Sequence, residues 1–202
     1  NDKIALIDTV KKGFTEEYLN NIKEIVPLDK IDYLVVNHNE PDHSGAMSAL
    51  LEHAPNIKLL CSYPALPFVQ NVLNVEVPIE TVKHDHSLDL GGKTLTFKGT
   101  PYLHWPDTMM TFLEEDHVLF SCDGFAAHIA FGDKMYADES QVDFDHEFHY
   151  YFDSIMRPFT HLIRKSLAKL EGLQVDLIAT SHGPLIRKDP QQYIDRYAEW
   201  CA

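Results

Sequence analysis

The chain has few cysteines, and none of them is placed as a disulfide framework or a thiolate metal site would require. The three cysteines, Cys61, Cys122 and Cys201, are widely spaced and form no C-x-x-C pair. Cys61 and Cys122 end apolar runs, so we interpret them as small buried residues, and we expect Cys201 to lie at the surface near the chain end. The cysteines therefore indicate a structural role and no chemistry.

Basic residues and long apolar runs are also scarce. The chain has 17 basic against 31 acidic residues and a formal net charge of -14, a balance that repels nucleic acid and anionic membrane surfaces. No apolar run approaches the length of a membrane span, and the opening NDKIALIDTV lacks the basic and apolar regions of a signal peptide. We expect a cytoplasmic protein with neither a nucleic-acid nor a membrane partner.

The pattern of apolar residues predicts one layered α/β domain. The 202 residues, 45% of them apolar, suffice for a single buried core. Short β-branched runs alternate with longer helical ones, and MMTFLEEDHVLFSC reads as an antiparallel hairpin. The polar segment 128–148 is weakly periodic and predicts a long excursion rather than a core element, and such loops often cover sites. We expect strands over 3–8, 32–37, 57–62, 94–99, 109–114, 117–122 and 175–181, and helices over 15–26, 44–54, 63–73, 149–171 (with a kink or boundary at Pro158) and 189–200.

Histidines and carboxylates gather where predicted strands end. His38, Glu40, Asp42 and His43 follow the run DYLVVN within six residues, which is costly to bury without a cation. We expect the turn to direct His38 and Glu40 to one side. The bend at Pro41 then directs Asp42 and His43 to a position next to it. This geometry fits two adjacent metal ions. Single metal-capable residues follow three further strand-like runs, and strand ends of an α/β sheet converge on one edge. These three are His104, Asp123 and His182.

The kinds of donor narrow the choice of metal. The set contains four imidazoles and three carboxylates and no thiolate. Mixed histidine and carboxylate ligands with open positions suit iron or manganese and also admit zinc. The residues alone therefore predict a site for two divalent ions without naming the metal.

Four motifs in this order carry a resemblance to a known family. H-x-E-x-D-H at 38–43, L-H-W-P-D at 103–107, F-S-x-D at 120–123 and S-H-G at 181–183 resemble the metallo-β-lactamase-like domain of the flavodiiron proteins. The zinc hydrolases of that superfamily look like H-x-H-x-D-H, whereas this chain has Glu40 in place of the second histidine. The resemblance covers nearly the whole chain, so residues 1–202 are identified as one such domain with an αββα sandwich fold.

The resemblance also implies a ligand set and an activity. One iron would be held by His38, Glu40 and His104, the other by Asp42, His43 and His182, with Asp123 bridging. The family reduces O2 to water, NO to N2O, or both. Its two irons store two electrons, while FMN on a flavodoxin-like domain after the diiron domain delivers further electrons to the partner chain of a head-to-tail dimer. A rubredoxin-type or nicotinamide-linked donor would supply electrons to that FMN.

The chain departs from the full family pattern in two respects. No phosphate-binding Gly-rich or Ser/Thr-rich loop follows a strand, so we find no FMN site. This chain opens with KIALIDTV, whereas members of the family it resembles have further strands before that position. We therefore expect a fragment that lacks its first strands and its flavin domain, and that is inactive without that domain.

Two other functions remain open from the sequence. A dinuclear zinc hydrolase of thioesterase or lactonase type would use Asp42 to orient a bridging hydroxide, although Glu40 argues against it. A diiron O2 sensor would bind the gas reversibly without turnover. Rapid consumption of O2 or NO distinguishes the reductase from both.

Several residues near the motifs have a second interpretation. Asp107 is a candidate partner for the second nitrogen of His104 or a turn cap, and His128 is a candidate pocket residue that donates protons. We interpret His84, His86, His146 and His149 as solvated surface residues, and the aromatic run at Phe148, Tyr150, Tyr151 and Phe152 as a core-facing helix stripe.

Overall fold

The first half of the chain builds a parallel sheet of four short strands. The computed structural model describes residues 2–73, 77–130, 132–139 and 141–202. The sheet has the order β1 (Ala5–Ile7), β2 (Tyr33–Val36), β3 (Lys58–Ser62) and β4 (Ile79–Val82). Because parallel neighbours need a crossover, helices lie between these strands in the sequence. They are α1 (Thr15–Lys23), α2 (Pro41–Ser44), α3 (Met47–His53) and α4 (Leu66–Leu73).

The second half forms a mixed sheet of five strands and a layer of three helices. The sheet has the order β5 (Ser87–Asp89), β6 (Thr94–Gly99), β7 (Met109–Leu113), β8 (Val118–Cys122) and β9 (Leu177–Thr180). Its pairs are antiparallel except β8 with β9, which is parallel. The helices are α5 (Phe144–Tyr151), α6 (Thr160–Leu167) and α7 (Pro190–Trp200).

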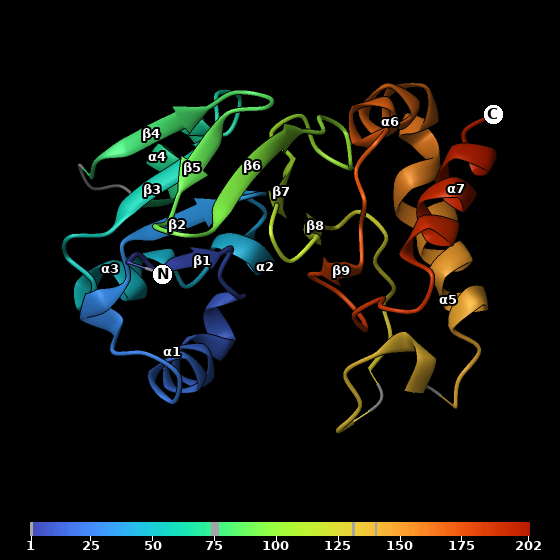
Figure 1. Ribbon diagram of the computed structural model, residues 1–202. Coiled ribbons are helices and arrows are strands. Elements are labelled where there is room, and N and C mark those ends of the chain that lie inside the picture. Colours follow the sequence, from blue (N-terminus) through green and yellow to red (C-terminus); the bar gives the residue numbers. More distant parts are fainter. Residues whose placement is uncertain (1, 74–76, 131, 140) are drawn as a thin grey trace.

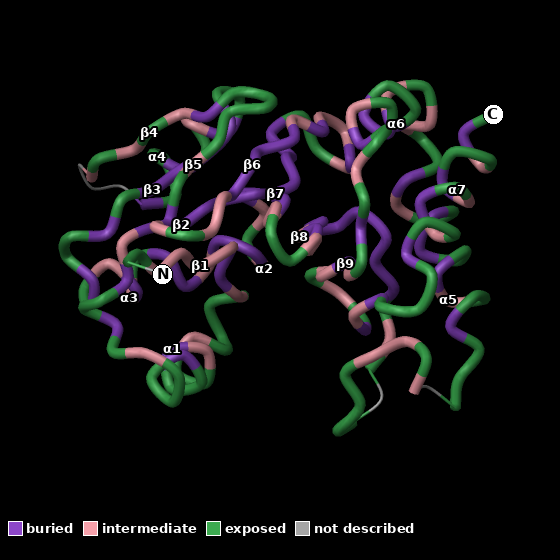
Figure 2. Tube along the Cα trace, in the orientation of Figure 1, coloured by how far each residue is buried: buried purple, intermediate pink, exposed green. Residues whose placement is uncertain are grey.

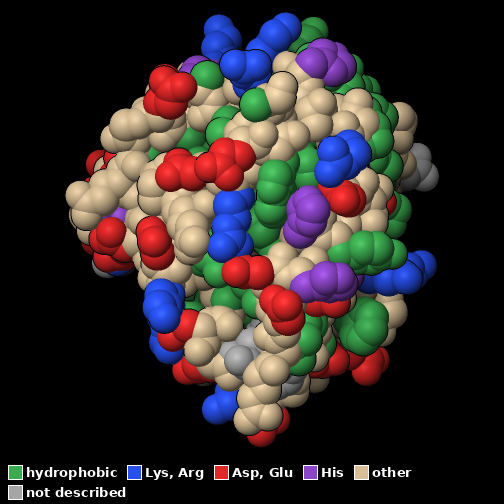
Figure 3. All heavy atoms as spheres, turned by 90° about the vertical axis from the view of Figure 1, so that its right-hand side faces the viewer, with side chains coloured by type: hydrophobic (Ala, Val, Ile, Leu, Met, Phe, Trp, Pro, Cys, Tyr) green, Lys and Arg blue, Asp and Glu red, His purple; other side chains and the backbone are tan. Residues whose placement is uncertain are grey.

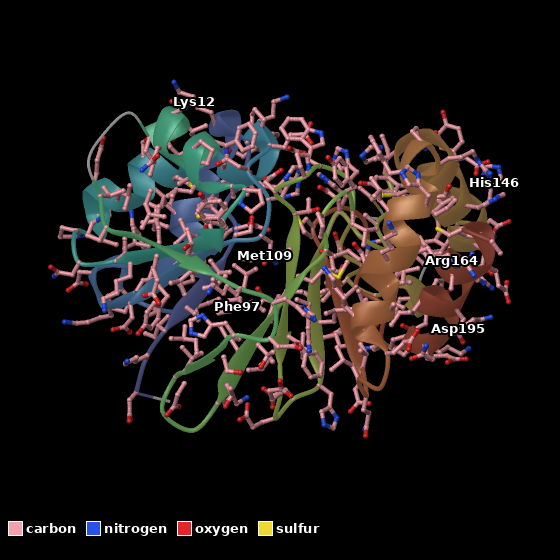
Figure 4. The ribbon with its side chains drawn as sticks, turned by 90° about the horizontal axis from the view of Figure 1, so that it is seen from above. Lys12, Phe97, Met109, His146, Arg164 and Asp195 are labelled. Carbon is pink, nitrogen blue, oxygen red and sulfur yellow. The ribbon has the colours of Figure 1, made fainter. Side chains whose placement is uncertain are left out.

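These elements stack as helix, sheet, sheet and helix (Figures 1 and 4). Leu34 and Leu59 of the first sheet pack outward against α1, α3 and α4. Phe97 and Met109, labelled in Figure 4, belong to the apolar cluster between the two sheets. Phe148 packs in a third cluster, between the second sheet and α5 to α7. Buried residues accordingly concentrate in the strands and on the inward helix faces (Figure 2), and the predicted αββα sandwich is confirmed.

Short helical turns complete the connections. A π-helical turn, Phe152–Met156, joins α5 to the turn that contains Pro158. Pro158 thus marks a boundary, as predicted, because proline lacks the N–H that a helix interior needs. The 3₁₀ turns are Lys12–Phe14, Leu28–Lys30, Ala137–Glu139, Arg157–Phe159 and Ala168–Leu170.

Several predicted elements have different bounds in the structure. The helix predicted over 44–54 is divided into α2 and α3, with Gly45 at the break. A side chain at Gly45 would lie 2.5 Å from the backbone nitrogen of Lys12, so only glycine fits this close approach. The helix predicted over 149–171 begins earlier, at Phe144. Asp143 caps it by accepting a hydrogen bond from the backbone N–H of His146.

Two strands and one cysteine differ from the prediction. β4 and β5 are short and carry few apolar residues, so their pattern was too weak to predict a strand. Cys201 is 8% exposed and packs in the core cluster beside α7, which corrects the prediction of a surface residue. The excursion predicted over 128–148 ends where α5 begins, and its residues 131 and 140 lie outside the described residues.

The outer faces of the helices carry mixed charge. Figure 3 shows acidic, basic and histidine side chains interspersed with apolar ones over the helical layer of α5 to α7. His146 and His149 on α5 are exposed, as are His84 and His86 before β5, which agrees with their interpretation as surface residues.

Among the described residues, no helix combines the length and the apolar character that crossing a membrane would require.

Candidate metal centre

Strand ends bring the seven predicted ligands to one edge of the sandwich. His38 and Glu40 follow β2 directly, and the following α2 carries Asp42 and His43. Proline at the first position of α2 starts this short helix, because its fixed φ suits a helix N-terminus. The other three ligands follow strands of the second sheet: His104 lies in the loop after β6, Asp123 follows β8, and His182 follows β9.

The seven residues form two adjacent groups. In the first, ligand atoms of His38, Glu40, His104 and Asp123 all lie within 4.8 Å of one another. The second group consists of Asp42, His43 and His182 under the same limit. The rings of His43 and His182 are 5.1 Å apart between centroids, and those of His38 and His104 are 5.4 Å apart. The structure thus brings the seven candidate residues together in two sets, with Asp123 in the first.

Asp123 lies between the two groups with one carboxylate oxygen toward each. Its Oδ2 is 3.6 Å from Nε2 of His38 and 3.5 Å from Nε2 of His104. Its Oδ1 is 3.1 Å from Nε2 of His43 and 3.2 Å from Nε2 of His182. The carboxylate is 2% exposed, so the surrounding protein fixes this orientation.

The spacing of the donors fits two metal ions. Two donors about 2.1 Å from a shared ion lie roughly 3.0–3.5 Å apart at tetrahedral or octahedral angles. Oε2 of Glu40 is 3.2 Å from Nε2 of His38 and 3.1 Å from Nε2 of His104. Oδ2 of Asp42 is 3.2 Å from Nε2 of His182. Oδ2 of Asp42 is also 3.7 Å from Nε2 of His43, so most donor pairs within each group have about the separation expected of ligands that share an ion.

The surroundings of the buried donor atoms support the same fit. The Oδ1 atom of Asp42 is buried and makes no hydrogen bond with the described residues, and the buried Nε2 atom of His43 lies 3.1 Å from Asp123 and 3.7 Å from Asp42. Three carboxylates converge here, which is unfavourable without positive charge. The imidazoles of His182 and His43 hold the pKa of Asp123 well below its usual range, against the opposing effect of burial. The site is thus built to hold cationic charge.

Asp107 pairs with His38, which corrects one prediction. Its Oδ2 accepts a hydrogen bond from Nδ1 of His38 at 2.9 Å and another from the backbone N–H of Asn39 at 2.9 Å. Both side chains are fully buried. The proposed partner was His104, its neighbour in the sequence, but the loop aims the Asp107 carboxylate back at the end of β2. Despite burial, the bond from His38 holds the pKa of Asp107 below its usual value.

His128 lies at the border of the second group. Its ring is 5.4 Å from that of His182 and 4.7 Å from that of Tyr151, both edge-on. His128 is exposed, so it reaches solvent beside a predicted ligand. Gly183 follows His182 with a φ of +80° and would place a side chain 2.5 Å from the carbonyl oxygen of Ala127. Glycine therefore allows the His182 turn to pack against the segment before His128.

Asn37 joins the ligand-bearing ends of the two sheets. Its Nδ2 donates to the backbone oxygen of Phe120 at 3.2 Å, and its Oδ1 accepts from the hydroxyl of Thr111 at 2.7 Å. Its backbone oxygen accepts from the N–H of Met109 at 2.9 Å. Because Asn37 precedes His38 and Phe120 shortly precedes Asp123, these bonds fix the distance between ligands of different sheets.

Sequence reasoning missed Asp8 as a residue of this region. It follows β1, just as His38 follows β2, and is 5% exposed. Its Oδ1 accepts hydrogen bonds from the backbone N–H groups of Asn37 at 2.7 Å and His38 at 3.4 Å. An acidic residue directly after an apolar run was the available signal, and it was read as the last residue of a strand.

An apolar groove opens beside the second group. It has a volume of about 560 Å³ and runs along α1, where Phe14, Ile22 and Ile25 line it. Asp42 and His182 of the second group also line it. These two donors are partly exposed, with 35% for the Asp42 side chain and 26% for His182. Small molecules therefore have access to the site.

Two facing sheets between helical layers, with histidines and carboxylates at one edge, define a metallo-β-lactamase-like domain. Comparison with known proteins agrees. The family model described as "ODP family beta lactamase" matches residues 1–183. The Flavo-diiron protein FprA2 of Clostridium acetobutylicum is 41% identical over 191 residues, which cover 93% of this chain and 48% of that protein. The anaerobic nitric oxide reductase flavorubredoxin of an Enterobacter species is 39% identical over 205 residues, 99% of this chain and 42% of that protein.

Solved structures give the same result. The rubredoxin oxygen:oxidoreductase of Desulfovibrio gigas superimposes with a TM-score of 0.94 at 31% identity, over 100% of this chain and 51% of that one. The flavodiiron protein of Giardia intestinalis superimposes with a TM-score of 0.92 at 33% identity, over 98% of this chain and 49% of that one. The chain belongs to the ODP family of β-lactamase-like domains, in the form that flavodiiron proteins carry. It spans about half the length of the relatives it matches.

Proposed function

We propose that this chain is the diiron domain of an oxidoreductase that reduces O2 to water, NO to N2O, or both. The observation that carries the proposal is Asp123, whose two oxygens face two separate groups of histidines and carboxylates. The names of two relatives, a nitric oxide reductase and an oxygen oxidoreductase, support the same activity. Glu40 supports iron over the zinc that the related hydrolases bind, because an added carboxylate favours a harder, redox-active ion.

The ligand assignment follows the two groups. His38, Glu40 and His104 would hold the first iron, and Asp42, His43 and His182 the second. Asp123 would bridge the two ions. Three carboxylates offset most of the charge of two divalent cations, which favours the reduced state of the pair. The buried His38, His43 and Asp123 provide a rigid base, whereas the partly exposed Glu40, Asp42 and His182 leave one side open to a gas.

The electron balance defines what the site needs from elsewhere. When bound, two ferrous ions supply two electrons and Lewis-acid positions for the gas. Coupling two NO to N2O and water takes two electrons and two protons, whereas reducing O2 to two waters takes four of each. His128, exposed beside His182, is our candidate for moving protons into the site. The protein needs no nucleophilic side chain of its own.

The remaining electrons would come from FMN on a flavodoxin-like domain. The chain spans about half of its relatives, which leaves length for such a domain in the whole protein. We propose that the whole protein is a head-to-tail homodimer that receives electrons from a rubredoxin-type or nicotinamide-linked donor. We also propose a cytoplasmic location, in accord with three buried free cysteines.

The direct test is gas consumption by the whole protein with its flavin domain. Reduced protein with two irons per chain is expected to consume O2 or NO over many turnovers, and His104→Ala is expected to abolish this. Glu52→Ala on the exposed side of α3 is the matched control and should retain full activity. Slow oxidation without turnover would indicate a sensor instead, and thioester or lactone hydrolysis with bound zinc would indicate a hydrolase.

A further inference from the structure

A second buried carboxylate, Asp8, lies behind one of the histidines of the metal centre. It follows β1 in a left-handed backbone conformation with a φ of 56°, which aspartate adopts more readily than most residues. One oxygen, Oδ1, accepts the backbone N–H groups of Asn37 and His38. The other, Oδ2, is buried and makes no hydrogen bond with the described residues. A buried carboxylate with a free oxygen needs a positive or polar neighbour.

The neighbour is His43. A carboxylate oxygen of Asp8, a ring nitrogen of His43 and the Sγ atom of Cys122 all lie within 4.8 Å of one another. Nδ1 of His43 is 3.7 Å from that sulfur, while Nε2 faces Asp123. The next residue, Thr9, donates both its backbone N–H and its hydroxyl to the carbonyl oxygen of His43, each at 2.7 Å. The turn after β1 therefore contacts the backbone of His43 and lies close to its ring.

Asp107 occupies the equivalent place in the first group. Its Oδ2 accepts the backbone N–H of Asn39 and the Nδ1 proton of His38. Both carboxylates therefore accept backbone N–H groups that follow β2, and each has an oxygen near a ring nitrogen of one histidine, Asp107 at 2.9 Å from His38 and Asp8 within 4.8 Å of His43. Histidines that bind metals commonly give their second nitrogen to a carboxylate or a carbonyl, which fixes the ring orientation and the tautomer.

We propose that Asp8 is a positioning residue for His43, as Asp107 is for His38, so that each metal of the pair has its own buried carboxylate behind one histidine ligand. The charge of Asp8 keeps the proton of His43 on Nδ1 and directs Nε2 toward the second metal. The inference rests on the proposed two-metal site, but it makes a separate claim about which ion Asp8 affects.

Asp8→Asn separates this role from a structural one. Asparagine keeps an oxygen that accepts the N–H groups of Asn37 and His38, so the end of β1 should retain its structure. It loses the negative charge behind His43. Asp107→Asn is the matched control, because it makes the same change behind His38. Circular dichroism and the melting temperature would establish that both variants fold.

The experiment adds Co²⁺ stepwise to the metal-free chain. Calorimetry measures the affinity of each binding step, and visible absorption reports the surroundings of the bound ion. Wild type is expected to bind two ions. Asp8→Asn should weaken one of them by about tenfold to a hundredfold and change its absorption, with recovery in Asp8→Glu. In a His43→Ala background Asp8→Asn should have no further effect, whereas in a His38→Ala background its effect should persist.

Two different results would count against the inference. If wild type binds two ions and Asp8→Asn binds both as tightly, with unchanged absorption, Asp8 is not a positioning residue although the two-metal site stands. An equal effect of Asp8→Asn in the His43→Ala and His38→Ala backgrounds would likewise overturn the pairing with His43. If wild type itself binds fewer than two ions, the two-metal site fails, and the inference with it.

Discussion

Asp123 places its Oδ1 atom 3.2 Å from Nε2 of His182, while its Oδ2 atom points away toward His104, 3.5 Å from Nε2. A single buried carboxylate thus contacts histidines that follow different strands and belong to different groups. This arrangement suits a bridge between two ions, and a site for one ion would not need it.

Removing the bridge should remove metal. Asp123→Ala deletes a side chain that faces both groups, so we expect the metal content to fall from about two ions per chain to one or none. Elemental analysis of the purified variant measures this. Asp116→Ala, on the exposed β7–β8 turn, is the control and should keep the wild-type content. Two ions per chain in Asp123→Ala would show that the bridging assignment is wrong.

Glu40 tests the choice of metal. Replacing it with histidine gives the ligand pattern of the zinc hydrolases, so Glu40→His should shift the bound iron-to-zinc ratio toward zinc. The ratio is measured after expression with equal supplies of both metals. Glu52→His adds a histidine at an exposed position and should leave the ratio unchanged. An unaltered preference for iron in Glu40→His would mean that another residue selects the metal.

Asn37 is expected to stabilise the contact between the sheets. Asn37→Ala removes both side-chain hydrogen bonds and leaves the buried hydroxyl of Thr111 without its acceptor. The free energy of unfolding should fall by about 1–3 kcal/mol, as is typical of an unsatisfied buried group. Urea denaturation of the metal-free chain measures this. Asn21→Ala on the exposed face of α1 should change it by less than about 0.5 kcal/mol, and equal effects would refute the role of Asn37.

The aromatic stripe of α5 divides into a buried and an exposed side. Phe148 is fully buried and its ring lies 5.2 Å from that of Tyr197 and 5.4 Å from that of Trp200 on α7. Phe148→Ala should destabilise the chain by about 3–5 kcal/mol. Tyr150 is 62% exposed, so Tyr150→Ala should cost less than about 0.5 kcal/mol. Thermal or urea unfolding compares them, and similar losses would contradict this division.

The sequence predicted the layers, and it predicted that the candidate ligands follow strands, because both depend on local patterns. Apolar runs define β2, β3 and β6 to β9, and His38, Asp123 and His182 stand directly after such runs. The short β4 and β5 have no comparable pattern, since the pairing partners that stabilise them are distant in the sequence.

Contacts between distant segments were beyond the reach of the sequence. Asp107 is close to His104 along the chain, yet it pairs with His38, because the loop after β6 folds back over the end of β2. Asp8 contacts His38 and approaches His43 only once β1 and β2 are paired. Cys201 is buried because the end of α7 packs onto the core, which its terminal position did not indicate.

The most direct test of the account is the metal content and identity of the chain expressed with both iron and zinc available. Two irons per chain, retained when the purified protein is challenged with zinc, are the result that the two groups around Asp123 predict. Two zincs without iron would contradict the redox function and favour a hydrolase. A chain that binds no metal at all would contradict the two-metal site itself.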